Sequence, residues 1–173
     1  LWRWGNPKNY GRGGGAERRL FGQHNPTWLA YGGGDLGLLV FNNGGERPEG
    51  DYAYSSVDEL VLPFDPERGF THAQDAPFGP EEPDWTYAPG REVFFSAFIS
   101  GAQRLPNGNT LICSGAPGHV FEVTQAGKVV WDYKNPYGGD VQPPDHAGGA
   151  PPLALFRATR LPRSHPGVVA LLD

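Results

Sequence analysis

Short apolar or alternating runs, separated by turn residues, make up most of the chain, and this pattern is typical of β-strands. No run longer than a turn or two has apolar residues at the helical period of about 3.6. We therefore expect an all-β fold. The predicted strands cover residues 1–4, 27–31, 37–42, 55–62, 84–87, 100–105, 110–114, 119–124, 128–133 and 155–161.

The connections between the predicted strands are of two kinds. Residues 106–109 (Pro-Asn-Gly-Asn) and 125–127 (Gln-Ala-Gly) are short reversals, and the first places Asn and Gly where a hairpin needs positive φ. They join three successive strands into a meander. Residues 43–54, 65–83 and 138–152 are rich in Gly, Pro and acids, so we expect them to be long surface loops.

The strand pattern occurs twice. Each occurrence ends on a tryptophan strand, at Trp85 and at Trp131, which lie 46 positions apart. This spacing is close to the length of a four-stranded propeller blade. The Arg-Leu-Pro sequence at 104–106 also recurs at 160–162. The sequence therefore predicts a partial β-propeller, with about two four-stranded antiparallel blades and a partial strand at each end.

We assign residues 1–173 to part of one propeller domain. Residues 1–5 are predicted to be the outer strand of a preceding blade, 21–88 and 93–135 the two blades, and 153–173 the start of a next blade and a tail. A blade buries its faces only against neighbours, so we expect further blades from the same or another chain, in an oligomer or a larger complex. A small β-sandwich is the alternative that the strand count permits.

Composition and charge exclude several functional classes. The formal net charge of −5 provides no basic footprint for nucleic acid. Cys113 is the single cysteine, so we expect neither a disulfide framework nor a thiolate metal cluster. No apolar stretch reaches the roughly 18 residues of a membrane span. Because the chain lacks methionine even at position 1, we expect a processed or internal segment with any export signal upstream.

The first candidate for chemistry is His24, in the motif Gln23-His24-Asn25 directly before the first strand of a blade. In a propeller this strand lines the central channel, so we expect the imidazole at one mouth of the channel. The simpler alternative is a histidine that is hydrogen-bonded within a loop between blades.

A second group of candidates follows the next strand. Asn42 and Asn43 end that strand, and Arg47 lies in the loop after it; a turn and a solvated arginine are the simpler alternatives. The apolar run 93–101 is expected to pack between blades. No pair of histidines has metal-ligand spacing, so we expect no metal site.

A succession of short motifs extends over nearly the whole chain, and each is weakly specific by itself. They are residues 2–5 (Trp-Arg-Trp-Gly), 23–24 (Gln-His), 39–44 (Leu-Val-Phe-Asn-Asn-Gly), 54–55 (Tyr-Ser), 95–113, 120–124, 129–133 and 155–158. In this order they resemble the C-terminal portion of bacterial arylsulfotransferase-family propellers.

The resemblance implies a six-bladed propeller, exported to the periplasm, that moves a sulfuryl group from an aryl sulfate to a phenol without a cofactor. His24 would be the catalytic nucleophile and become transiently sulfated. A neutral imidazole is an available nucleophile at neutral pH, and it divides the transfer into two displacements. The residues that would bind substrate or support His24 are Gln23, Asn25, Asn42, Asn43, Arg47 and Tyr54.

Two positions depart from the family pattern. The chain has Asn42 where the family commonly has Asp, and Ser56 where it commonly has Arg. These differences remove a carboxylate and a cation. The alternative function is therefore a non-catalytic propeller that serves as a binding or scaffold subunit of a larger assembly.

Overall fold

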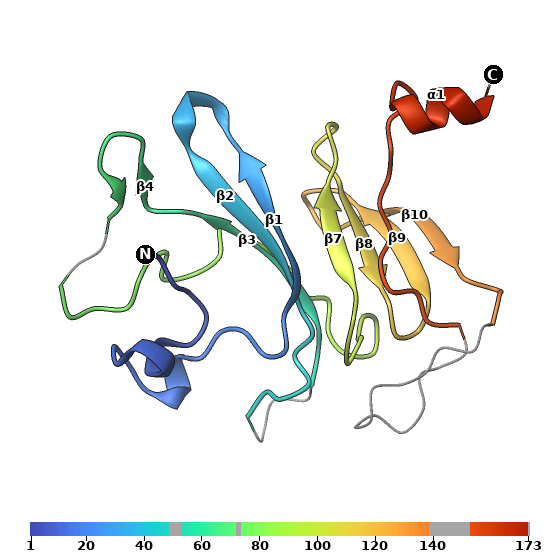
Figure 1. The fold of residues 1–173 in the computed structure, drawn as a ribbon. Helices are drawn as coiled ribbons and strands as arrows, with labels where there is room; N and C mark the ends of the chain where they lie inside the picture. Colours follow the sequence, from blue (N-terminus) through green and yellow to red (C-terminus); the bar gives the residue numbers. More distant parts are fainter. Residues whose placement is uncertain (49–52, 72–73, 139–152, 173) are drawn as a thin grey trace.

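The computed structural model describes residues 1–48, 53–71, 74–138 and 153–172, and most of its regular structure is strand (Figure 1). The strands are β1 (His24–Ala30), β2 (Leu36–Asn42), β3 (Ser56–Val61), β4 (Phe64–Asp65), β5 (Gly69–Phe70), β6 (Trp85–Tyr87), β7 (Gly101–Arg104), β8 (Thr110–Ser114), β9 (His119–Val123) and β10 (Val129–Lys134). The helical elements are the 3-10 turns η1 (Pro7–Tyr10), η2 (Gly15–Glu17) and η3 (Gly32–Gly34), and the helix α1 (Pro166–Leu172).

The strands form two four-stranded antiparallel sheets and one small hairpin. The first sheet has the order β1-β2-β3-β6 and the second has the order β10-β9-β8-β7. The β4–β5 hairpin lies between β3 and β6 in the chain, in a segment that was predicted to be a loop. The prediction of an all-β fold with two four-stranded antiparallel blades is confirmed.

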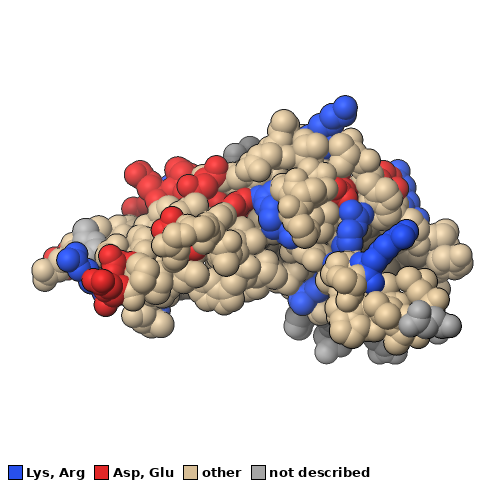
Figure 2. All heavy atoms as spheres, turned by 90° about the horizontal axis from the view of Figure 1, so that it is seen from above, with Lys and Arg blue, Asp and Glu red and all other residues tan. Residues whose placement is uncertain are grey.

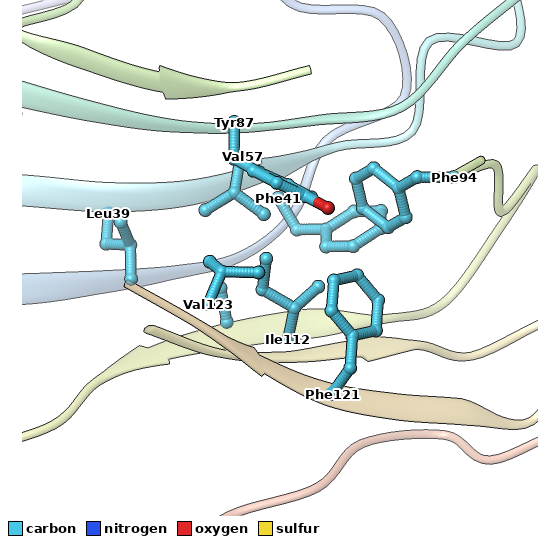
Figure 3. Packing of buried hydrophobic residues seen from close by; sticks show 9 residues of the cluster. Leu39, Phe41, Val57, Tyr87, Phe94, Ile112, Phe121 and Val123 are labelled. Atoms are coloured by element: carbon cyan, nitrogen blue, oxygen red, sulfur yellow. The ribbon is translucent and has the colours of Figure 1, made fainter. Parts of the chain in front are cut away.

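A hydrophobic core lies between the two sheets (Figure 3). Its buried members are Leu39, Phe41, Val57, Tyr87, Phe94, Ala102, Ile112, Phe121 and Val123. Phe94, from the segment that connects the sheets, packs edge-on against Phe41 and Phe121, with ring centroids 5.5 and 5.6 Å apart. Both β1 and β2 contact β7, and β1 and β7 lie side by side in the middle of Figure 1. The sheets thus meet near their inner strands, as neighbouring propeller blades do.

A largely buried ion pair also joins the sheets. Arg104 at the end of β7 pairs with Glu59 of β3, and its guanidinium carbon lies 4.8 Å from the ring centre of Trp85. Glu59 and Trp85 are register partners in the first sheet. Tyr31 also donates a hydrogen bond to Glu59, and burial raises the pKa of this tyrosine. Because a buried carboxylate is costly without a cation, the ion pair favours this one arrangement of the sheets.

The same contact recurs between the second sheet and the C-terminal segment. Arg160 pairs with Glu122 of β9, and its guanidinium carbon lies 5.5 Å from the ring centre of Trp131. Glu122 and Trp131 are again register partners. The Arg-Leu-Pro repeat in the sequence therefore corresponds to a repeated three-residue contact in the structure.

Residues 155–161 were predicted to be a strand, but they run along the second sheet without joining it. The Gln103 amide exchanges two hydrogen bonds, of 3.1 and 2.8 Å, with the backbone of Arg160. Leu155 and Ala158 from this segment cover a second apolar cluster, which consists of Leu105, Leu111, Cys113 and Val120.

Residues 1–4 were also predicted to be a strand, and they too form none. The indoles of Trp2 and Trp4 donate hydrogen bonds of 2.7 Å to the carbonyl oxygens of Gly79 and Pro80, so this segment is attached to the loop before β6. A blade strand needs backbone partners from its own blade. For both terminal segments, the described residues contain no such partner strand.

Helix α1 was not predicted, because its apolar residues follow no helical spacing that separates a buried from an exposed face. It has seven residues and none of them is buried. Among the described residues, no helix has the length and hydrophobicity needed to cross a membrane.

Charge is unevenly distributed over the face shown in Figure 2. Acidic atoms gather on the left of that view, on the side of the first sheet, and basic atoms gather on the right, on the side of the second sheet. This face is therefore mostly acidic on one side and mostly basic on the other, with a few groups of the opposite sign on each side.

Candidate active site

His24 begins β1, the strand of the first sheet that lies beside β7, and its side chain is half-buried. The segment before it is attached to the end of β2 by two hydrogen bonds, one to a side chain and one between backbone groups. Phe21 N–H donates to the Asn42 side-chain oxygen at 2.9 Å, and Gly44 N–H donates to the Phe21 carbonyl at 2.8 Å. The position of the imidazole is thus set by two strands of the sheet.

Asn43 determines which nitrogen of His24 carries the proton. Its Nδ2 donates to the carbonyl oxygens of Ser96 and Ile99, at 2.7 and 3.1 Å, so its Oδ1 must be the atom that faces His24. This Oδ1 lies 2.7 Å from His24 Nδ1, and the Gly22 carbonyl oxygen lies 3.1 Å from the same nitrogen. Two acceptors therefore hold the proton on Nδ1, and Nε2 keeps its lone pair.

Buried serines hold Asn43 in turn. Ser55 Oγ donates to the Asn43 carbonyl at 2.9 Å and accepts a hydrogen bond of 2.9 Å from Ser96 N–H. Ser96 Oγ accepts hydrogen bonds from Ser100 Oγ and from the backbone N–H of Ala116, which ties the network to the second sheet. The carbonyls that orient Asn43 are therefore fixed from both sheets.

Sequence reasoning missed these serines. Ser96 and Ser100 lie in the apolar run 93–101, which was predicted to pack between blades, and Phe94 does so. The two small hydroxyls inside an apolar run were the signal, because a buried hydroxyl needs a hydrogen-bond partner.

Asn42 points away from His24 and has a structural role. Its Oδ1 accepts from Phe21 N–H, and its Nδ2 donates to the Arg19 carbonyl at 2.9 Å and to Asp58 Oδ2 at 3.4 Å. An aspartate in its place would lose both donated bonds and set a second carboxylate against Asp58. Asn42, where the family commonly has Asp, is therefore the residue that suits the surrounding hydrogen bonds.

Asp58 is a buried carboxylate that sequence reasoning also missed. Ser56 and Thr86 donate hydrogen bonds to it at 3.0 and 3.1 Å, together with the longer bond from Asn42. Burial raises its pKa above the ordinary value, and these three neutral donors offset part of that effect. The sequence pattern does not indicate this burial, because a polar residue in an alternating strand is predicted to face solvent.

The other predicted site residues are divided among different surroundings. Arg47 and Tyr54 line a cavity with Asn42 and Asp58, and His24 is not among the residues that line it. Asn25 has a φ of 51° and packs its side chain against Gly101 of β7, at a point where a β-carbon would not fit. Gln23 is exposed and borders a hollow beside the N-terminal segment. Of the six supporting candidates, Asn43 is the one whose side chain hydrogen-bonds to His24 among the described residues.

Chemically, the arrangement consists of a histidine with a fixed tautomer and an amide behind it. An orienting group of this kind is what a catalytic histidine requires, because it keeps one nitrogen ready to accept a bond or a proton.

Comparisons of the chain with protein-family models, with curated proteins and with solved structures found no match. The arylsulfotransferase resemblance therefore stays a prediction that is based on the motifs alone.

Proposed function

We propose that the protein is an arylsulfotransferase-like propeller, in which His24 carries a sulfuryl group from an aryl sulfate to a phenolic acceptor. The observation that supports this best is the tautomer of His24. Asn43 and the Gly22 carbonyl hold the proton on Nδ1, so Nε2 is a nucleophile without prior proton removal.

The transfer takes two displacements. In the first, the Nε2 lone pair attacks the donor sulfur, an N–S bond forms and the aryl O–S bond breaks, and the phenolate takes a proton from solvent. In the second, the acceptor phenol oxygen attacks the sulfur, the N–S bond breaks and its electron pair returns to Nε2, and the acceptor proton passes to solvent. During both steps Asn43 Oδ1 stabilises the imidazole, which becomes more positive while it is sulfated.

A direct assay tests the proposal. The full-length protein is incubated with 4-nitrophenyl sulfate and phenol, and release of 4-nitrophenolate is followed by its yellow colour. The His24→Ala variant is expected to lose at least about 100-fold in rate. The His165→Ala variant, which removes an exposed histidine of the C-terminal tail, is expected to keep the rate.

A rescue experiment separates chemistry from folding. Added imidazole is expected to restore part of the turnover of a His24→Gly variant, because the free base replaces the missing nucleophile. Mass spectrometry of the wild-type protein with donor alone is expected to find one sulfuryl group on the peptide that contains His24. An unmodified peptide and a His24→Ala variant as fast as wild type would both contradict the role of His24.

The second candidate is a non-catalytic propeller that binds a partner or forms part of a scaffold. It is favoured by the positions of Arg47 and Tyr54, which line a cavity with Asp58 and contact each other. A sulfuryl group needs a cationic or hydrogen-bonding clamp at the nucleophile. Absence of 4-nitrophenolate release by the wild-type protein would favour this candidate.

Under either candidate we expect further blades to complete the propeller. The support comes from comparing equivalent residues of the two sheets. Tyr87 of β6 is buried by Phe94 and by Phe121 of the second sheet, whereas its counterpart Tyr133 of β10 remains 38 % exposed. A blade packed on β10 would cover Tyr133 in the same way.

A further inference from the structure

A cavity of about 360 Å³ lies between the N-terminal segment and the first sheet, and His24 is not among its lining residues. Its walls come from the segment before β1, from the ends of β2 and β3, and from the region of β6. The lining residues that matter for its chemistry are Arg18, Phe21, Arg47, Tyr54, Ser56 and Asp58. The volume is enough for a small ligand.

Arg47 is held rigidly at this cavity. Its Nε donates to the Tyr54 carbonyl at 3.2 Å, and its guanidinium carbon lies 3.8 Å from the ring centre of Tyr54 and 5.3 Å from that of Phe21. Gly44 makes room for this geometry, because a β-carbon there would lie 2.9 Å from Arg47 Nε and 1.8 Å from the Tyr54 oxygen. The backbone and two rings thus fix the plane of the guanidinium before any ligand arrives.

The terminal nitrogens of Arg47 are only weakly engaged by the protein. Nη2 lies 3.5 Å from Ser56 Oγ, at the limit of a hydrogen bond, and Ser56 itself donates to Asp58. Asp58, which also lines the cavity, accepts hydrogen bonds from Ser56, Thr86 and Asn42 and interacts electrostatically with Arg47, but among the described residues no hydrogen bond joins it to Arg47. The Nη edge of Arg47 keeps donor capacity for a ligand.

The cavity lining contains both signs of charge, and two of its three arginines are already in ion pairs. Arg18 lies with its guanidinium carbon 4.4 Å from the centre of the Phe21 ring, so two arginines share one aromatic side chain. The described lining residues include three arginines, the third being Arg19, and the two acids Asp58 and Glu82. Arg19 pairs with Glu82 at 2.6 Å, and Arg18 pairs at 3.0 Å with the exposed Glu46, so Arg47 is the arginine of the lining that forms no close ion pair with another described residue. A guanidinium edge with two parallel N–H groups matches the oxygens of a carboxylate, sulfate or phosphate.

We propose that this cavity binds a small oxyanion, or the anionic end of a larger molecule, with the Arg47 Nη edge as its anchor and Arg18 as the second cation. The site does not include His24, and its existence does not depend on sulfuryl transfer.

Calorimetric titration of the full-length protein tests the proposal. The probes are sodium sulfate, sodium phosphate and sodium acetate, each at constant ionic strength against a sodium chloride control. We expect saturable binding of at least one of them at one site per chain, and the preferred anion distinguishes tetrahedral from planar ligands. If none of the three anions produces saturable binding heat, the proposal is wrong.

Variants locate the site. Arg47→Gln is expected to weaken binding at least about 10-fold, and Arg47→Lys, which keeps the charge but loses the paired N–H groups, several-fold. Arg163→Gln, in the exposed tail, is the matched control and is expected to bind as wild type does. If Arg47→Gln lowers the melting temperature, Arg18→Gln is the second variant, and it too is expected to weaken binding. Unchanged affinity in Arg47→Lys and Arg18→Gln would place the anion elsewhere and refute the proposal.

Discussion

At the scale of single residues, Asn43 is the link between the imidazole and the rest of the molecule. It is a positioning residue under the proposed function, since it sets the tautomer of His24 and contacts no substrate. Asn43→Ala is expected to lower kcat on the order of 100-fold while KM stays unchanged, because the loss concerns the nucleophile and not ground-state binding. Steady-state kinetics with 4-nitrophenyl sulfate measures both constants.

If Asn43 had a purely structural role, the kinetic constants of Asn43→Ala would change differently. In that case kcat and KM would change together or not at all; the melting temperature falls under either role, because Asn43→Ala leaves the Ser96 and Ile99 carbonyls without the donor that Asn43 provides. Ser55→Ala is a useful companion variant, because Ser55 supports Asn43 through its carbonyl and through Ser96. It is expected to have a smaller effect on kcat than Asn43→Ala.

Asp58 makes stability depend on pH. Burial raises its pKa in the folded state, so above the unfolded pKa of about 3.9 the folded protein binds more protons than the unfolded one. The stability that this proton provides is fully present below that pH and is lost as pH rises through the folded pKa. Asp58→Asn removes the effect, and its amide can still accept from Ser56 and Asn42.

Thermal melts of both proteins from pH 4 to pH 7 check this expectation. The melting temperature of Asp58→Asn relative to wild type should rise as pH increases. Two parallel curves would mean that Asp58 titrates alike in both states.

At the scale of elements, the two arginine contacts differ in burial, and this difference predicts different stabilities. The Arg104 and Glu59 side chains are 16 % and 10 % exposed, whereas that of Arg160 is 41 % exposed although its partner Glu122 is only 6 % exposed, so the difference lies in the arginine. Arg104→Met leaves a buried carboxylate without its cation and is expected to cost about 3 kcal/mol in unfolding free energy. Arg160→Met is expected to cost about 1 kcal/mol or less, since its cation is partly in water.

Chemical denaturation of the two variants measures the difference. Glu122 retains hydrogen bonds from Asn109 and Asn107, at 2.6 and 3.3 Å, when Arg160 is removed. Equal losses in the two variants would show that burial does not determine the strength of these contacts.

The elements within the two blades were the most predictable part of the fold. The apolar residues of β8 and the Asn-Gly turn before it specify this strand from local sequence alone. Its predicted bounds agree with the structure. The terminal strands were wrong for a physical reason. A strand is completed by neighbours, and an extended segment such as 1–4 is held equally well by two indole hydrogen bonds to a loop.

At the scale of the whole molecule, the candidate site could be predicted only in part. His24 and Asn43 are recognisable from local motifs, yet their relation depends on contacts across long sequence distances, such as the bond from Asn43 to Ser96. The order of the motifs grouped Asn42, Arg47 and Tyr54 with His24, but a motif order does not specify the directions of the side chains. Neighbouring residues of a strand point to opposite faces, so Asn42 and Asn43 have different surroundings.

The covering of Cys113 by the C-terminal segment provides the molecule with its own reporter thiol. Its Sγ lies 3.9 Å from the Leu155 carbonyl oxygen, and burial raises its pKa to about 11. Disulfide reagents attack the thiolate, so labelling at pH 8 should be slow until the segment detaches. Arg160→Met should accelerate labelling and Arg163→Met should not. The labelling rate of Cys113 would then measure how often the C-terminal segment detaches from the second sheet.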